Sequence, residues 1–229
     1  MGIKRGFTLA EVLITLVIIG VIAAVTIPSL INKTNEQELV VAVKKNFSVI
    51  SQAFEKIVAE NGEINPSFLG ESEHQATEKM GELFKNVLAT QNICGMGTDG
   101  DCFPEDGYKL FDGRYWCDFN FDETFYKLRL NDGSSLAIFG YPNYMNWGTS
   151  ESLKNTVGYV WVDVNGDKGP NTNGIDVYSY RITKYGIVPN GTPYETYSPL
   201  SSCRTTGSGC AAWVILKGNM KYLREDISW

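Results

Sequence analysis

The sequence predicts an α+β protein in which a long N-terminal helix packs on an antiparallel β-sheet. Residues 6–57 combine one unbroken apolar segment with a helical stripe of apolar side chains. β-forming residue types dominate the second half of the chain, where all twelve tyrosines and all five tryptophans follow residue 107. Turn-forming residues divide that half into short strands, which is typical of an antiparallel sheet.

The apolar segment of residues 6–31 is long enough to cross a membrane, because about 20 residues at ~1.5 Å each cover the ~30 Å hydrocarbon core. Lys4 and Arg5 precede it and indicate that the N-terminus stays in the cytoplasm. A cleaved secretory signal is excluded, since its apolar region is shorter and a polar mature start follows it. A simple membrane anchor leaves one residue unexplained, Glu11, because a carboxylate is costly in hydrocarbon.

Gly6, Phe7 and Glu11 together resemble the class III leader of type IV pilins and type II secretion pseudopilins. The resemblance implies that a prepilin peptidase cleaves after Gly6 and that the new N-terminal residue, Phe7, is methylated. The glutamate five residues into the mature chain is the family's hallmark. Residues 1–6 would then be the leader and residues 7–31 the transmembrane and polymerisation helix.

The same resemblance implies a structural subunit of a type IV pilus-like or type II secretion pseudopilus filament. Expected partners are the prepilin peptidase, other pilin or pseudopilin subunits, the assembly platform in the inner membrane, and lipid. The protein would first be a single-pass inner-membrane protein and then part of a periplasmic or cell-surface filament. A pilus subunit, a secretion pseudopilin and a minor pilin for DNA uptake share this leader, so all three stay open, as does a membrane-tethered binding or adhesion protein that never polymerises.

Cleavage would create a positively charged amine on Phe7, and this amine offers a partner for Glu11. Paired opposite charges are tolerated in hydrocarbon better than single ones. In a filament, the amine of one subunit would pair with the carboxylate of a neighbour and fix the register between helices, as buried polar groups do in coiled coils. The alternative is a glutamate that simply reaches the membrane interface.

The helix should continue beyond the membrane through residues 32–61. Its apolar positions step by three or four residues and so form one face of a helix: Val40, Val43, Phe47, Ile50, Phe54 and Ile57. Asn61-Gly62 is a helix stop signal. Residues 7–61 would make a helix of about 80 Å, and residues 62–229 would form the globular head.

Inside the head we expect a second amphipathic helix over residues 76–90 and four strands over residues 124–130, 134–141, 157–164 and 175–183. Asn131-Asp132-Gly133 forms the turn of the first strand pair. Residues 210–216 fit a helix and a strand equally well.

Five cysteines follow the membrane segment, on the side where disulfides persist. The close pairs Cys94/Cys102 and Cys203/Cys210 are predicted to close loops, which leaves Cys117 over. Zinc is disfavoured, because no CxxC spacing occurs and the single histidine lies in a polar run.

The segment of residues 163–176 is rich in Asp, Asn and Gly. Calcium takes six to eight oxygen ligands, and glycines let a loop wrap around the ion. The segment resembles the calcium-binding loop of major type II pseudopilins, and the predicted side-chain ligands are Asp163, Asn165, Asp167 and Asp176. The alternative is a solvated hairpin loop whose Asn, Asp and Gly residues only form turns.

The net charge and the absence of known motifs argue against nucleic-acid binding and against enzyme activity. The net charge is −6, and it becomes −8 when Lys4 and Arg5 leave with the leader, so no nucleic-acid partner is expected. The sequence contains none of the common hydrolase, metalloprotease or phosphate-loop motifs, and we expect no enzyme. The aromatic residues are expected mainly in the core, with a carbohydrate-binding or adhesive surface as the alternative.

Overall fold

The computed structural model describes residues 8–98 and 100–229, which form one compact unit up to Glu38 and another over Leu39–Trp229. The leader, residues 1–6, and Phe7 lie outside the described residues. The helices are α1 (Leu9–Asn61), α2 (Pro66–Leu69), α3 (Glu73–Val87), α4 (Glu151–Lys154) and α5 (Ala211–Lys217), with 3-10 turns η1 (Leu200–Ser202) and η2 (Lys221–Leu223). The predicted long helix is therefore present as α1.

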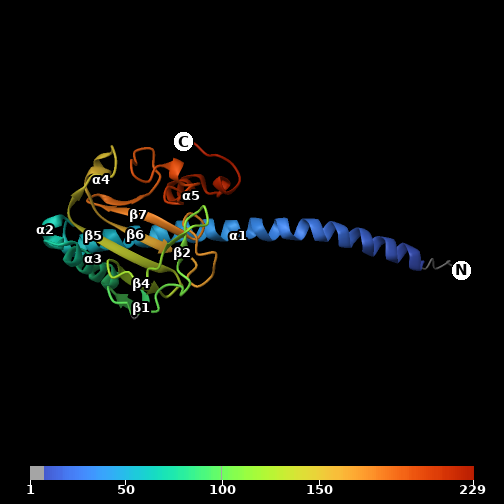
Figure 1. Ribbon diagram of the computed structural model, residues 1–229, viewed down its shortest axis with the longest axis horizontal. Coiled ribbons are helices and arrows are strands. Elements are labelled where there is room, and N and C mark those ends of the chain that lie inside the picture. Colours follow the sequence, from blue (N-terminus) through green and yellow to red (C-terminus); the bar gives the residue numbers. More distant parts are fainter. Residues whose placement is uncertain (1–7, 99) are drawn as a thin grey trace. The chain divides into compact units, whose positions relative to one another are not determined.

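The strands form one large antiparallel sheet and one small ribbon (Figure 1). The sheet has the order β1-β4-β5-β6-β7-β8, and the ribbon pairs β2 with β3. Their bounds are β1 (Thr90–Gly95), β2 (Tyr108–Lys109), β3 (Tyr115–Cys117), β4 (Tyr126–Leu130), β5 (Ser135–Met145), β6 (Thr156–Asp163), β7 (Val177–Thr183) and β8 (Gly186–Pro189). The prediction of an α+β head on an antiparallel sheet is confirmed.

The register of the central strands places apolar side chains in rows across one face of the sheet. Leu128, Leu136, Val162 and Tyr178 are successive partners on β4, β5, β6 and β7. All four are buried. Because side chains alternate along a strand, the register of one pair decides which side chains of both strands point to this face.

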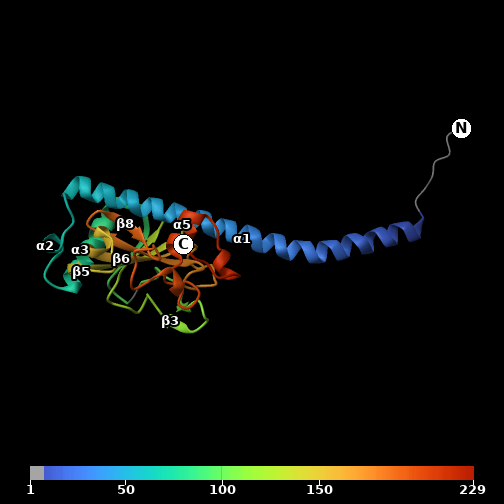
Figure 2. The ribbon, with the colours of Figure 1, turned by 90° about the horizontal axis from the view of Figure 1, so that it is seen from above.

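The part of α1 that follows Leu39 covers this face together with α3, and Figure 2 shows it running along one side of the head. Five of the six predicted stripe residues are buried, and the sixth, Phe47, packs its ring 5.6 Å from that of Tyr180 on β7. Lys45 pairs with Asp132 in the β4–β5 turn at 2.8 Å. The stripe is therefore core packing, which is the role expected for this half of the helix.

The opposite face of the sheet is covered by aromatic side chains rather than by helices. Phe125, Phe139 and Tyr159 lie in mutual contact there, at centroid distances of 5.0–6.1 Å. The segment between β1 and β4, which carries the β2–β3 ribbon, adds Phe103 and Phe119 to this cluster. The sheet is thus buried on both sides, and most of the described aromatic residues are either buried or packed against the core, as expected.

Several boundaries differ from the sequence prediction. The second helix begins at Glu73, because the Ser72 hydroxyl accepts from the Gln75 amide and caps it. It ends at Val87, because Thr90, the first residue of β1, already pairs with Leu130 of β4. Residues 211–217 are helical, which settles the ambiguous segment. The short elements α2, α4, β1, β2, β3 and β8 were not predicted, because their register depends on partners distant in sequence.

Gly140 on β5 lies where the sheet touches the backbone of α3. A Cβ atom at this position would lie 2.3 Å from the carbonyl oxygen of Ala76. The Gly140 amide also donates to the Thr77 hydroxyl at 3.1 Å. A side chain here would push the helix away from the sheet, since a backbone carbonyl cannot rotate aside.

We expect Gly140→Ala to lower the free energy of unfolding by about 1–3 kcal/mol through overpacking. The matched control is Gly97→Ala, whose new Cβ would meet its nearest neighbour at an ordinary 3.7 Å. Thermal unfolding followed by near-UV circular dichroism measures both. Equal melting temperatures for the two variants would contradict the close contact between β5 and α3.

Candidate functional site

The N-terminal end of α1 is organised around Thr8 and Glu11. Thr8 accepts the first helical hydrogen bond from Val12, and both its amide and its hydroxyl donate to Glu11 Oε2, at 2.8 and 2.7 Å. The Glu11 amide donates back to the Thr8 hydroxyl at 3.3 Å. This reciprocal pair is a capping box, in which a Thr and a Glu three residues later satisfy each other's free amides.

The capping box was not predicted from the sequence, although the pattern Thr8-Leu-Ala-Glu11 is the signal for one. It gives Glu11 a role within its own helix in addition to any role between subunits. The carboxylate at the positive end of the helix dipole is also electrostatically favourable. Gly6 and Phe7, the predicted processing residues, lie outside the described residues.

The first part of α1 is apolar and exposed along its length. Leu9–Ile27 is a 19-residue candidate membrane span, and none of its apolar window is buried inside the structure. Leu9 and Val25 are 81% and 72% exposed. An apolar surface of this extent requires lipid or another apolar helix around it.

The acidic loop, residues 163–176, connects β6 with β7. Asp163 is the last residue of β6 and pairs with Val177 at the start of β7, so Asp163 and Asp176 come together at the same end of the sheet. Both side chains belong to fully buried residues. Antiparallel pairing, rather than spacing in sequence, brings these two carboxylates together.

Several donors surround the two carboxylates. Asp163 accepts from the Tyr108 hydroxyl at 2.6 Å and from the Gly166 amide at 2.8 Å. Asp176 accepts from the amides of Thr172 and Asn171 at 2.7 and 2.8 Å. Tyr108 comes from the β2–β3 ribbon, and nothing in the local sequence of the acidic loop points to it.

Burial raises the pKa of both carboxyl groups. The pKa of Asp163 rises to about 7, mainly through desolvation and also through the negative charge of Asp176, against the opposing hydrogen bond from Tyr108. The pKa of Asp176 rises to about 6, again mainly through desolvation. Two buried carboxylates that interact electrostatically are unfavourable when both are ionised, and a bound cation would reduce that penalty.

The oxygen atoms around these carboxylates suit a calcium ion. Buried amide oxygens of Asn165 and Asn171 have no hydrogen-bond donor among the described residues. With the two carboxylates they supply the carboxylate and amide oxygens that calcium prefers. No group of three or more His, Cys, Asp or Glu side chains within metal-binding distance occurs in the described part of the chain, so amide or backbone oxygens would have to complete the shell.

The fourth predicted ligand, Asp167, is not part of this group. Its side chain is 65% exposed and pairs with Arg129 of β4 at 2.6 Å. The nearby guanidinium offers a stronger partner than a buried carboxylate pair, which would repel a third negative charge. In this structure Asp167 therefore lies apart from the other three predicted ligands, whereas Asp163, Asn165 and Asp176 lie together.

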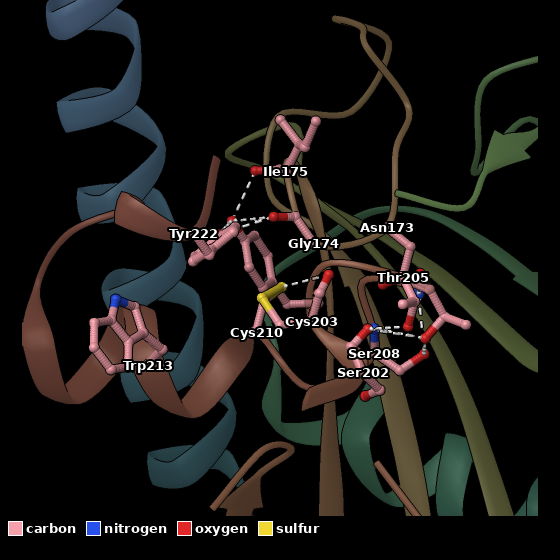
Figure 3. The surroundings of a disulfide bond; sticks show 12 residues. Asn173, Gly174, Ile175, Ser202, Cys203, Thr205, Ser208, Cys210, Trp213 and Tyr222 are labelled. Atoms are coloured by element: carbon pink, nitrogen blue, oxygen red, sulfur yellow. Dashed lines mark hydrogen bonds between the residues drawn. A yellow bond between two sulfur atoms is a disulfide. The ribbon is translucent and has the colours of Figure 1, made fainter. Parts of the chain in front are cut away.

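The Cys203–Cys210 disulfide closes a loop that lies next to residues 173–174 of the acidic loop (Figure 3). The loop it closes docks on the segment before Asp176, where the Asn173 side-chain amide donates to Thr206 O at 2.9 Å and to the Ser208 hydroxyl at 3.2 Å. Tyr222 donates to Gly174 O at 2.8 Å from the other side. The backbone of residues 173–174 is thereby fixed from two directions.

The second predicted disulfide, Cys94–Cys102, is also present, with its Cα atoms 6.2 Å apart. It joins β1 to the segment that covers the aromatic face of the sheet. Cys117 on β3 is free and half-buried. Burial, together with the carboxylates of Asp122 and Asp118, raises its pKa, so the thiol stays protonated at neutral pH.

Comparison with known proteins gives one match. Residues 1–27 match the family model described as the prokaryotic N-terminal methylation motif. A search of curated proteins and a search of solved structures each found no match. The chain therefore carries, at its N-terminus, the class III leader of type IV pilin and pseudopilin precursors.

Proposed function

We propose that this protein is a subunit of a type IV pilus-like or type II secretion pseudopilus filament. The observation that carries the proposal is the methylation motif at residues 1–27. After cleavage at Gly6–Phe7, the subunit would wait in the inner membrane and then polymerise through the first part of α1. The motif points to a structural protein rather than an enzyme.

The exposed apolar surface of Leu9–Ile27 supports this mechanism. In the membrane, lipid covers that surface. In a filament, neighbouring copies of the same helix would cover it, so extraction from the membrane need not expose apolar area to water. A membrane-tethered binding protein that never polymerises also explains the apolar helix, but it gives no role to a processed N-terminus.

Glu11 would set the axial alignment between neighbouring subunits of the filament. In the isolated helix its Oε2 atom accepts from Thr8. In the filament the Phe7 amine of a neighbouring subunit would add an ionic partner to the same carboxylate. Such a pair forms only when two helices are axially aligned, so it would select one stagger between subunits.

We also propose that the acidic loop binds calcium through Asp163, Asp176 and the amide oxygens of Asn165 and Asn171. Bound calcium would neutralise the two buried carboxylates and tie the end of β6 to the start of β7. The support is the pair of buried carboxylates and the two buried amide oxygens without donors. A hairpin that only makes turns does not require buried acids.

The first prediction from this proposal concerns processing. In a host that has a prepilin peptidase, mass spectrometry of the membrane-extracted protein should show an N-terminal peptide that starts at a methylated Phe7. A Gly6→Leu variant, which spoils the cleavage position, serves as the control and should keep residues 1–6. Recovery of the intact Lys4-Arg5-Gly6 sequence from the unmutated protein would favour the tethered alternative.

Charge pairing can be separated from helix capping at Glu11. Glu11→Gln keeps an oxygen that accepts from Thr8 but removes the charge, because glutamine also serves in a capping box. We expect normal membrane insertion and a loss of filament yield, measured by shearing and immunoblotting. The control is Thr8→Ala, which weakens the cap by about 0.5–2 kcal/mol but keeps the charge. Normal yield from Glu11→Gln with reduced yield from Thr8→Ala would assign Glu11 to capping alone.

Calcium should raise the melting temperature of the full-length protein in detergent. At 100 times its dissociation constant a ligand adds about 2.7 kcal/mol, which corresponds to a shift of about 5–10 °C relative to excess chelator. Asp163→Asn and Asp176→Asn should remove this shift, whereas Asp167→Asn, in the same loop but paired with Arg129, should keep it. Identical melting temperatures of the unmutated protein in both buffers would support the alternative, a hairpin loop that only forms turns.

The calcium effect should also depend on pH. The carboxyl pKa values of Asp163 and Asp176, about 7 and about 6, exceed the value of about 3.9 in an unfolded chain. The folded state therefore holds protons more tightly, and in chelator its stability should fall as pH rises from about 4 to about 7. Calcium binds the ionised form, so the stabilisation should grow over the same range. A pH-independent calcium shift would contradict the role of these two carboxyl groups.

A further inference from the structure

The aromatic face of the sheet contains a cavity of about 360 Å³ that the filament function does not use. Its walls include seven aromatic side chains, Trp116, Phe119, Phe125, Tyr141, Trp147, Tyr159 and Trp161. They come from β3, β5, β6 and the segments that follow β3 and β5. The volume lies at the lower end of the range for small-molecule sites.

The aromatic walls are held in place by the sheet. The rings of Trp116 and Trp161 meet edge to face at 4.6 Å, and those of Tyr141 and Tyr159 lie 5.8 Å apart. Tyr159 is paired in register with Arg181 on β7. Side chains fixed on paired strands form a preorganised site, because little ordering remains for a ligand to impose.

Polar groups occur among these rings, and their charges offset one another. The Arg181 guanidinium lies 4.0 Å from the centre of the Trp147 ring and pairs with the buried carboxylate of Glu195 at 3.4 Å. It also donates to the Ser198 hydroxyl at 3.3 Å. Asp122 adds a carboxylate to the lining. The cavity therefore carries no excess positive charge.

Three residues that line the cavity have a buried polar atom without a hydrogen-bond partner among the described residues. They are Trp147 (Nε1), Arg181 (Nε) and Asn190 (Oδ1). Buried polar atoms are normally paired, because leaving one unpaired costs roughly 1–3 kcal/mol. Trp147, Arg181 and Asn190 therefore place incompletely paired polar side chains among the aromatic lining.

This combination selects a chemical class of ligand. An anion would meet the Asp122 carboxylate in the lining, and the Arg181 guanidinium over Trp147 is already paired with Glu195. A neutral ring with one apolar face and several hydroxyl groups fits both the aromatic walls and the polar residues of the lining, Asp122, Asn190 and Ser198. We propose that the cavity binds a neutral sugar ring, a hexose or an N-acetylhexosamine.

The test uses the full-length protein, monomeric in a detergent without a sugar headgroup, so its outcome does not depend on filament assembly. A glycan array that displays neutral and acidic sugars identifies the probe, and the methyl glycoside of the best neutral sugar is then titrated. Three of the five tryptophans line the cavity, so tryptophan fluorescence reports binding directly. We expect saturable binding of a neutral sugar.

Trp116→Ala removes one aromatic wall and should weaken binding by about tenfold, which corresponds to about 1.4 kcal/mol. The matched control is Tyr115→Ala, which removes a 66% exposed aromatic side chain from the same strand but does not alter the lining. It should leave the affinity unchanged. A melting curve shows whether each variant is folded.

A second readout needs no mutation of the cavity. Cys117 lines it and is the free thiol, so a bound sugar should slow its modification by a maleimide. Absence of any neutral glycan hit, preference for acidic sugars, or binding that Trp116→Ala leaves intact would each overturn the proposal. Equal loss of binding in Trp116→Ala and Tyr115→Ala would also overturn it.

Discussion

The head depends on one constraint, the simultaneous burial of both faces of the central strands. All seven residues of β7 are buried, which is possible only because helices cover one face and aromatic side chains the other. The row from Leu128 to Tyr178 fixes the register on the helical side. Once that register is set, alternation sends Tyr159 and Arg181 to the aromatic side and brings Asp163 beside the start of β7. The acidic loop and the aromatic cavity thus both follow from one strand alignment.

The α1 helix meets two environments along its length, and its composition changes accordingly. Up to Ile27 it is apolar around its whole circumference and exposed. From Val40 onward only a stripe is apolar, and that stripe is buried against the sheet. A helix that is apolar on all sides suits lipid or a bundle of helices, whereas a stripe suits one packed face. One helix thereby carries both an apolar span and a packed stripe, and the methylation motif at residues 1–27 is consistent with a membrane-anchored N-terminal part.

Besides Lys127, whose amine donates to backbone carbonyls, buried charged residues of the described head occur at the acidic loop and at the aromatic cavity. At the acidic loop, two carboxylates of the same sign are buried together, with Tyr108 and backbone amides as their donors. At the aromatic cavity, Arg181 and Glu195 are opposite in sign and pair with each other. The first arrangement favours a cation, while the second leaves the cavity close to neutral. The Cys203–Cys210 disulfide lies beside the acidic loop, next to Gly174.

The sequence by itself determined the leader, the membrane segment, the helical stripe, the four central strands and the two disulfides. These features are local, since periodicity, turn residues and short cysteine spacing are written within a few residues of one another. The capping box of Thr8 and Glu11 was equally local and could have been predicted. Tertiary structure alone decided that Tyr108 donates to Asp163 and that Asp167 pairs with Arg129. It also decided that aromatic residues from distant segments enclose a cavity, because strand pairing and loop packing unite residues whose separation in sequence carries no signal.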